Sequence, residues 1–252
     1  MARHNIQKQS GVLMTTLPAI PTLTTRQMVE VDRLMIAEYG IQLIQMMENA
    51  GRNLAHQARQ MLGGLITRRR IIVLCGAGNN GGGGVVAARY LHNWGADVRV
   101  ILAAETRKLK DVPAQQWHTL RAMGVAGIAS AVVDTGAPEL VVDALIGYGL
   151  HGDPYGAAAT WIHWANTWSC PILALDAPSG LDTTTGTAGN PCVRATATLT
   201  LALPKEGLLA PQARPYVGVL YLADIGVPPK LYQSLGLDVG PIFAETDIVR
   251  LC

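Results

Sequence analysis

The sequence predicts an α/β fold in which helices cover both faces of a mostly parallel central sheet. Three observations carry this prediction. Continuous apolar runs of strand length alternate with segments of helical periodicity. Two helical segments precede the first strong strand. Of the 252 residues, 49% are apolar and only 15% are charged, which is typical of a chain with a substantial buried core.

The two N-terminal helices are predicted from a cap signal and from apolar spacing. Thr24 and Gln27 have the spacing of a capping box, so the first helix is expected to begin there and to end near Gly40. A second helix is predicted from Leu43 to Met61, because apolar residues recur three and four apart throughout it. Both helices are an addition to the alternating β/α chain that follows.

The alternation of strands and helices begins at residue 71. Strands are predicted at Ile71–Cys75, Asp97–Ala103, Ala131–Asp134, Leu140–Ile146, Ile172–Asp176, Ala197–Leu203 and Val217–Asp224. Helices are predicted at Gly83–Trp94, Ala114–Met123 and Tyr155–Trp168.

The chain is interpreted as one domain with a leader. Residues 1–21 carry no periodic pattern and contain two prolines at their end, so a flexible leader is expected there. No long linker, internal repeat or low-complexity tract divides residues 22–252, which are expected to form a single domain.

Charge and cysteine content argue against several kinds of partner. The formal net charge of +2 is too small to indicate a nucleic-acid or anionic-membrane surface. The four cysteines show no C-x-x-C spacing and no metal-ligand pattern with the histidines, so a reducing, cytoplasmic compartment is expected. No apolar run approaches the roughly 18 residues that span a bilayer.

A glycine-rich segment after the first strand is the main candidate for ligand binding. Six glycines fall between Gly76 and Gly84, and a small-residue helical pattern follows. Strand, glycine loop and helix in this order place free backbone N–H groups at the positive end of a helix dipole, where a phosphate can bind.

The same segment contains a dinucleotide-binding pattern, Gly76-x-Gly78-x-x-Gly81, and Glu105 follows the next strand where a ribose-binding acid is expected. A Rossmann dehydrogenase is therefore one hypothesis. Two observations weigh against it. Four consecutive glycines are unusual for the pattern, and no His or Lys lies in a recognisable hydride-transfer context.

Three further loops follow predicted parallel strands, at the sheet edge where open α/β folds bind ligands. Asp143 lies within an apolar strand, Asp176 ends another before a Pro-Ser-Gly turn, and Lys205 follows a third. A carboxylate in apolar surroundings costs free energy unless it is paired or bound to a cation. The alternatives are a cap or turn former for Asp143, an ordinary Asp/Pro/Gly turn at 176–180, and a solvated surface lysine for Lys205.

Oxygen-bearing side chains at three strand ends indicate a cation site. Asn80, Asp143 and Ser179 offer amide, carboxylate and hydroxyl oxygens. Such ligands suit a hard cation, and a single carboxylate favours a monovalent ion over Ca²⁺.

Three tryptophans, Trp161, Trp164 and Trp168, fall on one face of a predicted helix. A stacking surface for a nicotinamide or adenine ring is one interpretation. Packing against the sheet is favoured, because helices bury themselves by this spacing.

The order and spacing of several motifs resemble the YjeF N-terminal domain family, the NAD(P)H-hydrate epimerases. The resemblance runs from about Leu23 to Pro228 and rests on LTTRQMVEVDRLMI, MMENAGR, the GAGNNGG loop, VVDALIGYGL, LDAPSGLDTTTG and LPKEGL. It implies a Rossmann-like, three-layer α/β/α domain. It also implies an isomerase that interconverts the R and S forms of NADHX and NADPHX, whose nicotinamide ring carries an added hydroxyl at C6.

The resemblance further implies partners. A dehydratase restores NAD(P)H from the S form. Since the sequence ends at Cys252, that dehydratase is expected to be a separate protein. A homodimer is expected, with the two N-terminal helices as contact surface.

The resemblance also implies roles for individual residues. Asp176 would contact the substrate near the chemistry, and Lys205 would be a second catalytic group. A potassium ion would be held by Asn80, Asp143 and Ser179. The substrate would be lined by Asn79, Asn80, Gly81, Gly82 and Gly83, and its phosphate would lie against Gly147, Tyr148, Gly149, Leu150, His151, Gly152 and Asp153.

One position departs from the family pattern. The family loop reads GNNGGDG, whereas this chain reads GNNGGGG, with Gly83 at the acidic position. The change removes a carboxylate from the substrate loop and is expected to add backbone freedom to it. The leading hypothesis is therefore an epimerase weakened at Gly83. The alternatives are a catalytically silent domain that binds a nucleotide-like ligand or acts as a dimeric scaffold, and, more distantly, the Rossmann oxidoreductase.

Overall fold

The structure is a computed structural model that describes residues 20–125, 127–129 and 137–252. Its strands form one sheet in the order β3-β2-β1-β4-β5-β6-β7-β8. Neighbouring strands are parallel except for the last pair, β7 and β8. The strands are β1 Arg70–Cys75, β2 Asp97–Leu102, β3 Gly127–Ala129, β4 Leu140–Ala144, β5 Ile172–Leu175, β6 Ala197–Leu201, β7 Val219–Ala223 and β8 Ile248–Arg250.

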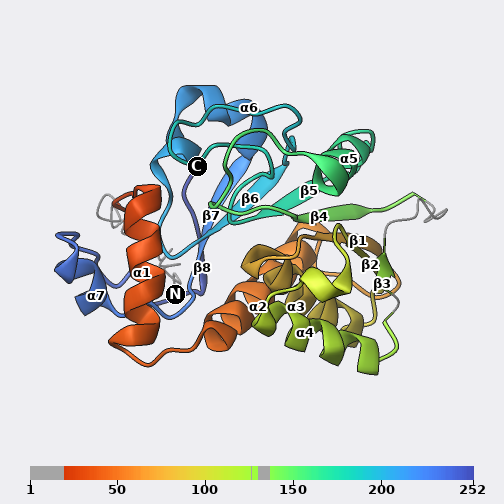
Figure 1. Ribbon diagram of the computed structural model, residues 1–252, viewed down its shortest axis with the longest axis horizontal. Coiled ribbons are helices and arrows are strands. Elements are labelled where there is room, and N and C mark those ends of the chain that lie inside the picture. Colours follow the sequence, from red (N-terminus) through yellow and green to blue (C-terminus); the bar gives the residue numbers. More distant parts are fainter. Residues whose placement is uncertain (1–19, 126, 130–136) are drawn as a thin grey trace, which may run out of the picture.

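Helices cover both faces of this sheet, which confirms the three-layer α/β/α prediction. The described helices are α1 Thr25–Ala37, α2 Leu43–Met61, α3 Asn79–Asn93, α4 Asp111–Ala122, α5 Gly156–Ala165, α6 Arg214–Val217 and α7 Pro229–Ser234. Short 3₁₀ turns occur at Thr106–Lys108, Glu206–Leu209 and Pro211–Ala213. Figure 1 shows α2, α3 and α4 together on one face of the sheet and α5 on the other.

The strands are apolar throughout because both of their faces are buried. In β1, Ile71 and Val73 pack into the cluster that includes residues of α2, α3 and α4. Ile72 and Leu74 pack into a second cluster with residues of α5. Trp161, which belongs to α5, lies in this second cluster.

The tryptophans therefore belong to the core, as the favoured interpretation holds. Trp161 is buried and meets Trp164 edge-on at a ring distance of 5.4 Å. Trp168 lies beyond the end of α5 and continues the row at 5.5 Å from Trp164.

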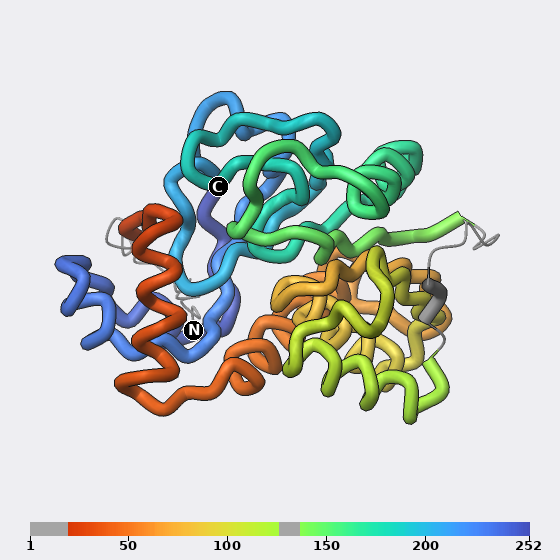
Figure 2. The backbone as a smooth tube through the Cα atoms, viewed as in Figure 1, coloured from red at the N-terminus to blue at the C-terminus, as the bar shows by residue number. Residues whose placement is uncertain are grey.

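The first helix is held by the other end of the chain. Leu23, just before α1, donates its N–H to Pro204 O at 2.9 Å and accepts from Glu206 N at 3.1 Å. The buried face of α1, with Met28 and Met35, shares a cluster with Leu231 of α7. Figure 2 shows α1, in red, beside the blue C-terminal segments. Helix α1 thus packs against the far edge of the sheet, whereas much of α2 packs with α3 and α4.

Element boundaries differ from the prediction mainly at the carboxyl ends of strands. The capping box at Thr24 and the bounds of α2 are confirmed. Strands β4 and β6 end two residues earlier than predicted, where the chain turns into loops that bear site residues. Helix α3 begins at Asn79, four residues before the predicted start. The prediction did not include β3, α6, α7 or β8.

Two predictions fall on residues that the structure does not describe. The strand expected at Ala131–Asp134 lies outside the described ranges, and nearly all of the expected leader, residues 1–19 of 1–21, does as well. Among the helices that are described, none has both the length and the apolar character needed to cross a membrane.

Candidate active site at the carboxyl ends of the strands

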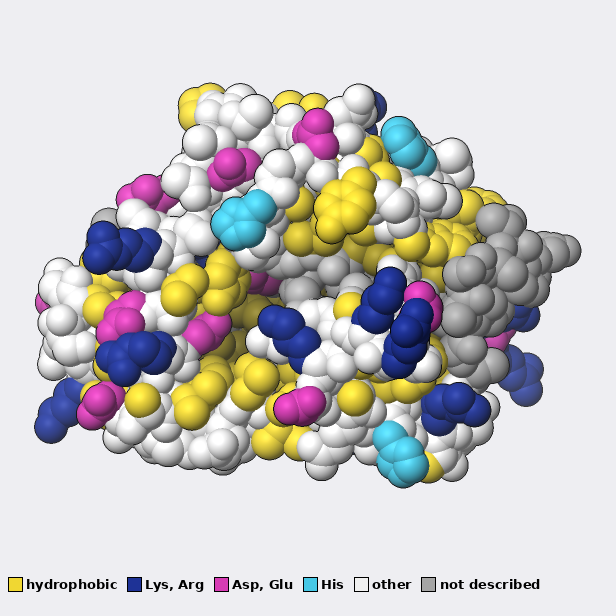
Figure 3. All heavy atoms as spheres, viewed as in Figure 1, with side chains coloured by type: hydrophobic (Ala, Val, Ile, Leu, Met, Phe, Trp, Pro, Cys, Tyr) yellow, Lys and Arg dark blue, Asp and Glu magenta, His cyan; other side chains and the backbone are white. Residues whose placement is uncertain are grey.

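A cavity of about 340 Å³ lies where the carboxyl ends of the parallel strands meet helices α1 and α2. Because β1, β4, β5, β6 and β7 run parallel, the segments that follow them reach the same edge of the sheet. The cavity is lined by Met28, Asp32, Leu43, Met46, Met47, Ala50, Gly78, Asn79, Asn80, Gly83, Lys110, Leu145, Ile146, Gly147, Tyr148, Gly149, Leu175, Asp176, Leu201 and Ile225. Figure 3 shows a hollow in the middle of this face, with Lys and Arg side chains beside it.

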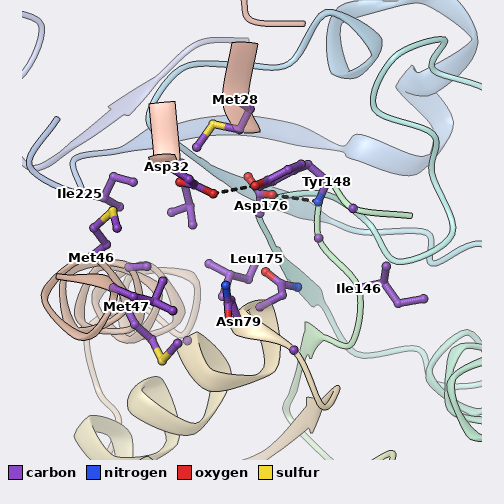
Figure 4. Close-up of a pocket in the computed structure, with 18 of the residues that line it drawn as sticks. Met28, Asp32, Met46, Met47, Asn79, Ile146, Tyr148, Leu175, Asp176 and Ile225 are labelled. Atoms are coloured by element: carbon purple, nitrogen blue, oxygen red, sulfur yellow. Dashed lines mark hydrogen bonds between the residues drawn. The ribbon is translucent and has the colours of Figure 1, made fainter. Parts of the chain in front are cut away.

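One wall of the cavity is apolar and rich in methionine. Met28 comes from α1, Met46 and Met47 come from α2, and Ile225 follows β7. Figure 4 shows these side chains on one side of the cavity, with Asp32, Tyr148 and Asp176 close together at its edge. Flexible, polarizable methionine side chains suit an apolar ring, and the polar group beside them can fix its orientation.

The glycine-rich segment brings the first turn of α3 against the neighbouring strand ends. A Cβ at Gly76 would lie 2.0 Å from Leu145 O, and one at Gly81 would lie 1.9 Å from Gly76 O. Neither position can carry a side chain without moving backbone. These glycines therefore act by close packing, and they bring Asn79 and Asn80 to the cavity.

Gly82, Gly83 and Gly84 are buried inside α3 rather than in a loop, so the expected gain of loop freedom at Gly83 is wrong. A Cβ at Gly82 would meet the Met47 sulfur at 2.5 Å. One at Gly83 would meet only the end of the Leu175 side chain, at 2.8 Å, and Gly83 also lines the cavity. A side chain at residue 83 would therefore project toward the cavity.

Asp176 and Lys205 form a buried ion pair beside the cavity. Lys205 is fully buried, and its Nζ donates to Asp176 Oδ1, to Thr200 Oγ1 at 3.3 Å and to Leu201 O at 2.9 Å. The alternative interpretation of Lys205 as a solvated surface residue is thus excluded. Asp176 has a left-handed backbone, with φ of 66°, and its Oδ2 accepts the Tyr148 N–H at 3.0 Å. The pair ties the ends of β5 and β6 to the loop after β4.

Tyr148 joins this pair to the first helix. Its hydroxyl donates to Asp32 Oδ2 at 2.6 Å, and its ring lies 5.8 Å from Lys205 Nζ (Figure 4). Burial raises the pKa of the Tyr148 phenol, and the charge of Asp32 adds to the effect, so the hydroxyl stays a donor. Burial also raises the pKa of Asp32, against the hydrogen bond from Tyr148, which lowers it.

Asp143 and Ser179 form a second buried polar group, between β4 and β5. Asp143 accepts from Ser179 Oγ at 2.6 Å, Ser179 N at 2.8 Å and Leu145 N at 3.2 Å. Burial raises the pKa of Asp143 to about 6, although these hydrogen bonds lower it. Ser179 Oγ also bonds the backbone of Ile146, accepting from its N–H at 2.9 Å.

Asn80 lies next to Gly147, which is in the loop that follows β4. A Cβ at Gly147 would lie 3.2 Å from Asn80 Oδ1 and 3.1 Å from Asp176 Oδ2. The Asn80 Nδ2 atom is buried and has no hydrogen-bond partner among the described residues. A buried amide nitrogen without a partner is unusual in a folded protein, which marks Asn80 as a candidate contact for a ligand.

The structure brings together many of the residues that the sequence singled out. Lining the cavity are Asn79, Asn80, Gly83, Gly147, Tyr148, Gly149 and Asp176. Gly81, Gly82 and residues 150–153 lie outside the lining. Gly81 packs against Gly76, and Gly82 packs against Met47, which lines the cavity. Asp153 accepts the Asn190 N–H at 3.0 Å, which fixes that loop to the turn before Pro191. In the described ranges, no three His, Cys, Asp or Glu side chains gather as a metal site.

Sequence reasoning missed Asp32 and the methionine wall. Asp32 follows Met28 by four residues and precedes Met35 by three, so it falls on the buried face of α1. A carboxylate on the buried face of a helix costs free energy unless it has a partner. The spacing alone therefore marks Asp32 as unusual. The partner, Tyr148, is too distant in sequence for that signal to identify it.

Comparisons with known proteins agree with this arrangement. The family described as YjeF-related protein N-terminus matches residues 43–207. A protein of Dehalogenimonas lykanthroporepellens named NAD(P)H-hydrate epimerase is 43% identical over 219 residues, which cover 87% of each chain. A protein of Rhodopirellula baltica with the same name is 33% identical, over 92% of this chain and 95% of its own.

Some relatives are longer than this chain, and a solved structure shares its fold. A protein of Moorella thermoacetica named bifunctional NAD(P)H-hydrate repair enzyme Nnr is 37% identical over 84% of this chain, which spans only 42% of that protein. The crystal structure of yeast ynu0 has a TM-score of 0.78 and 20% sequence identity, covering 92% of this chain and 100% of its own. This last likeness shows the shared fold.

Removal of the Lys205 charge is expected to destabilise the protein strongly. In Lys205→Met the Asp176 carboxylate stays buried without its cation, a loss of about 3–5 kcal/mol in the free energy of unfolding. Urea unfolding followed by circular dichroism measures it. Adding Asp176→Asn to that variant is expected to restore part of the loss, and exposed Lys230→Met serves as the control without effect. Equal stability of Lys205→Met and wild type would show that the pair is not structural.

Proposed function

The chain belongs to the family of YjeF-related protein N-termini, and we propose that it catalyses NAD(P)H-hydrate epimerisation, the interconversion of R and S forms of NADHX and NADPHX. The observation that carries the proposal is the cavity in which Asp176, Tyr148 and Asn80 converge beside an apolar wall. Relatives that match nearly the whole chain are named for this isomerase activity. The activity of the longer bifunctional relatives is not part of the proposal.

The chemistry suits the cavity. Epimerisation at C6 breaks the bond between C6 and the hydroxyl oxygen and forms it again on the opposite face of the ring. The ring nitrogen supplies the electron pair that expels the hydroxyl, and a positioned acid or base carries its proton. The methionine wall would hold the ring, while Asp176 would contact the substrate near C6 and Lys205 would support Asp176.

We propose that the phosphates of the substrate lie toward α3 and the loop after β4. The N-terminal backbone of α3, at Gly78 to Asn80, reaches the cavity, and a helix N-terminus favours an anion. Lys110 lines the same cavity and would add a positive charge. Residues 147–149 lie at its edge, and the proposal extends the phosphate contacts through 150–153 to Asp153.

The alternative of a catalytically silent domain or dimeric scaffold is not favoured. The buried carboxylates of Asp143 and Asp176 and the fully buried Lys205, at the carboxyl ends of the strands, are costly groups for a scaffold to retain. The Rossmann oxidoreductase is also less favoured, because relatives that match nearly the whole chain are named NAD(P)H-hydrate epimerase.

We further propose that Asn80, Asp143 and Ser179 hold a potassium ion. The residues fit such an ion, since Asp143 is a fully buried carboxylate without a cationic partner among the described residues and the Asn80 amide is half unsatisfied. Rotating the Asn80 amide exchanges its nitrogen and oxygen, so either end can face the site. The ion would neutralise Asp143 and fix Asn80 at the cavity.

Three expectations about the cellular setting are carried forward as proposals. The protein is proposed to act in the cytoplasm, ahead of a separate dehydratase that consumes the S form. It is also proposed to be a homodimer. Helix α1 exposes Val29 and Ile36, and Tyr39 is exposed just after its end, which supports the N-terminal helices as the contact surface.

The epimerase assay mixes R-NADHX with the purified protein and an S-specific dehydratase. The protein is expected to accelerate consumption of the R form over the spontaneous rate, because only the S form is drawn off. The regain of absorbance by NADH reports the rate. A rate equal to that without the protein would refute the proposed function.

Restoring the family acid is expected to tighten substrate binding. In Gly83→Asp the carboxylate would enter the cavity at the expense of a small shift of Leu175. A new charge-assisted hydrogen bond of about 1.5 kcal/mol corresponds to a fall in KM of about tenfold. Gly83→Ala brings the steric change without the charge and is expected to leave KM unchanged or raised. If Gly83→Asp behaves like Gly83→Ala, residue 83 does not contact the substrate.

Potassium is expected to raise the melting temperature of the wild type relative to choline chloride of equal ionic strength, because an ion bound only by the folded state stabilises it. The effect should weaken below pH 6, where Asp143 takes up a proton that competes with the ion. Asp143→Asn should abolish the response, whereas Asp97→Asn, at an exposed strand start, should keep it. The same response in Asp143→Asn would place the ion elsewhere.

A further inference from the structure

Two carboxylates line the cavity among the described residues, Asp32 and Asp176. The inference that follows rests on the proposed epimerase function. When the C6 hydroxyl leaves, its oxygen must gain a proton, and when water adds to the other face, a proton must be removed. Among the described residues of the cavity lining, these two carry the carboxyl groups that can exchange such a proton.

The Asp176 carboxyl is already committed to its neighbours. Its Oδ1 accepts from the Lys205 ammonium and faces Thr200 Oγ1 at 3.5 Å, and its Oδ2 accepts the Tyr148 N–H. Lys205 in turn donates to three acceptors. A proton taken up by Asp176 would disrupt an ion pair that joins two strand ends to the loop after β4. This arrangement suits a fixed negative charge that positions the substrate.

The Asp32 carboxyl is bonded on one side only. Its Oδ2 accepts from the Tyr148 hydroxyl at 2.6 Å, whereas its Oδ1 has no hydrogen-bond partner among the described residues. Figure 4 shows Asp32 beside Tyr148 and Asp176 at the edge of the cavity. Met28, four residues before it on the same helix, belongs to the apolar wall. The free oxygen is therefore available next to the place where the ring would bind.

We propose that Asp32 is the catalytic residue that exchanges the proton of the C6 hydroxyl, with Tyr148 holding its carboxyl in place. Protonated Asp32 gives its proton to the hydroxyl oxygen, the bond between C6 and oxygen breaks, and water leaves. The electron pair of the ring nitrogen forms a double bond to C6. Water then adds to the other face, the pair returns to nitrogen, and the Asp32 carboxylate takes the released proton.

The surroundings of Asp32 support this role. Burial raises its pKa, which favours the protonated form that the first step needs, and the negative charge of Asp176 adds to the rise. The Tyr148 hydrogen bond and the positive charge of Lys205 lower the pKa, and they would stabilise the carboxylate left after the first step. Asp32 lies outside residues 43–207, the part of the chain that matches the family.

The test compares Asp32→Asn with Glu30→Gln in the coupled assay with R-NADHX. Glu30 lies on the same helix and pairs only with exposed Arg33 among the described residues, so it is a matched control for the loss of one charge. Asp32→Asn is expected to lower kcat by about 100-fold or more while KM stays within about threefold, since proton transfer contributes that much. Glu30→Gln should match the wild type.

A second variant separates proton exchange from a structural role. If Asp32 must be protonated, activity falls as the pH rises through its pKa. Tyr148→Phe removes a hydrogen bond that lowers this pKa, so the falling limb of the kcat profile should move to higher pH. A merely structural role would reduce activity without moving the limb. Thermal unfolding of each variant checks that it is folded.

Three outcomes overturn the inference. Asp32→Asn that is folded and retains the wild-type kcat would exclude Asp32 from the chemistry. A limb that stays in place in Tyr148→Phe, or that persists in Asp32→Asn, would assign the proton exchange to another group. A wild type without activity would refute the proposed function itself, and the inference with it, which distinguishes that failure from the other two.

Discussion

The Lys205 ammonium has no exposed surface, so each of its N–H groups must find an acceptor inside the protein. It finds them in the Asp176 carboxylate, the Thr200 hydroxyl and the Leu201 carbonyl. Satisfying this one cation requires β5 to end where Asp176 can face it, with a left-handed backbone at that residue. On either side of Lys205, the backbone of Pro204 and Glu206 pairs with Leu23. The groups around Lys205 thus compensate one buried charge for its loss of water.

The layered fold follows from the sequence because its signals are local. Unbroken apolar runs indicate strands that are buried on both faces, and apolar residues three and four apart indicate α2 over its whole length. Helix α3 was predicted too short, because consecutive glycines usually end helices, whereas here Gly81, Gly82 and Gly84 are required by close packing against other elements. That requirement comes from tertiary contact and is invisible in a single sequence.

The candidate site divides in the same way. Asp143 and Asp176 could be chosen because a carboxylate in or after an apolar strand is anomalous by itself, whereas the role of Lys205 follows only from the family resemblance. The spacing also sets Asp32 on the buried face of α1, but the roles of Asp32 and Met28 depend on α1 lying against the carboxyl ends of strands encoded far downstream. Gly83 is an intermediate case. Its departure from the family loop is visible in the sequence, but only the structure shows that the missing side chain would point past Leu175 toward the cavity.

The pairing of Leu23 with the segment around Lys205 has a consequence for how the chain folds. Helix α1 is synthesised well before Leu231 of α7 and Val249 of β8, which complete its buried face. Contacts between residues so distant in sequence form slowly, because a long loop must close before they are gained. The half of the sheet around β1 and β2 can form early, whereas the cavity also needs Ile225, which follows β7. A nascent chain thus holds no complete pocket until the segment after β7 has been made.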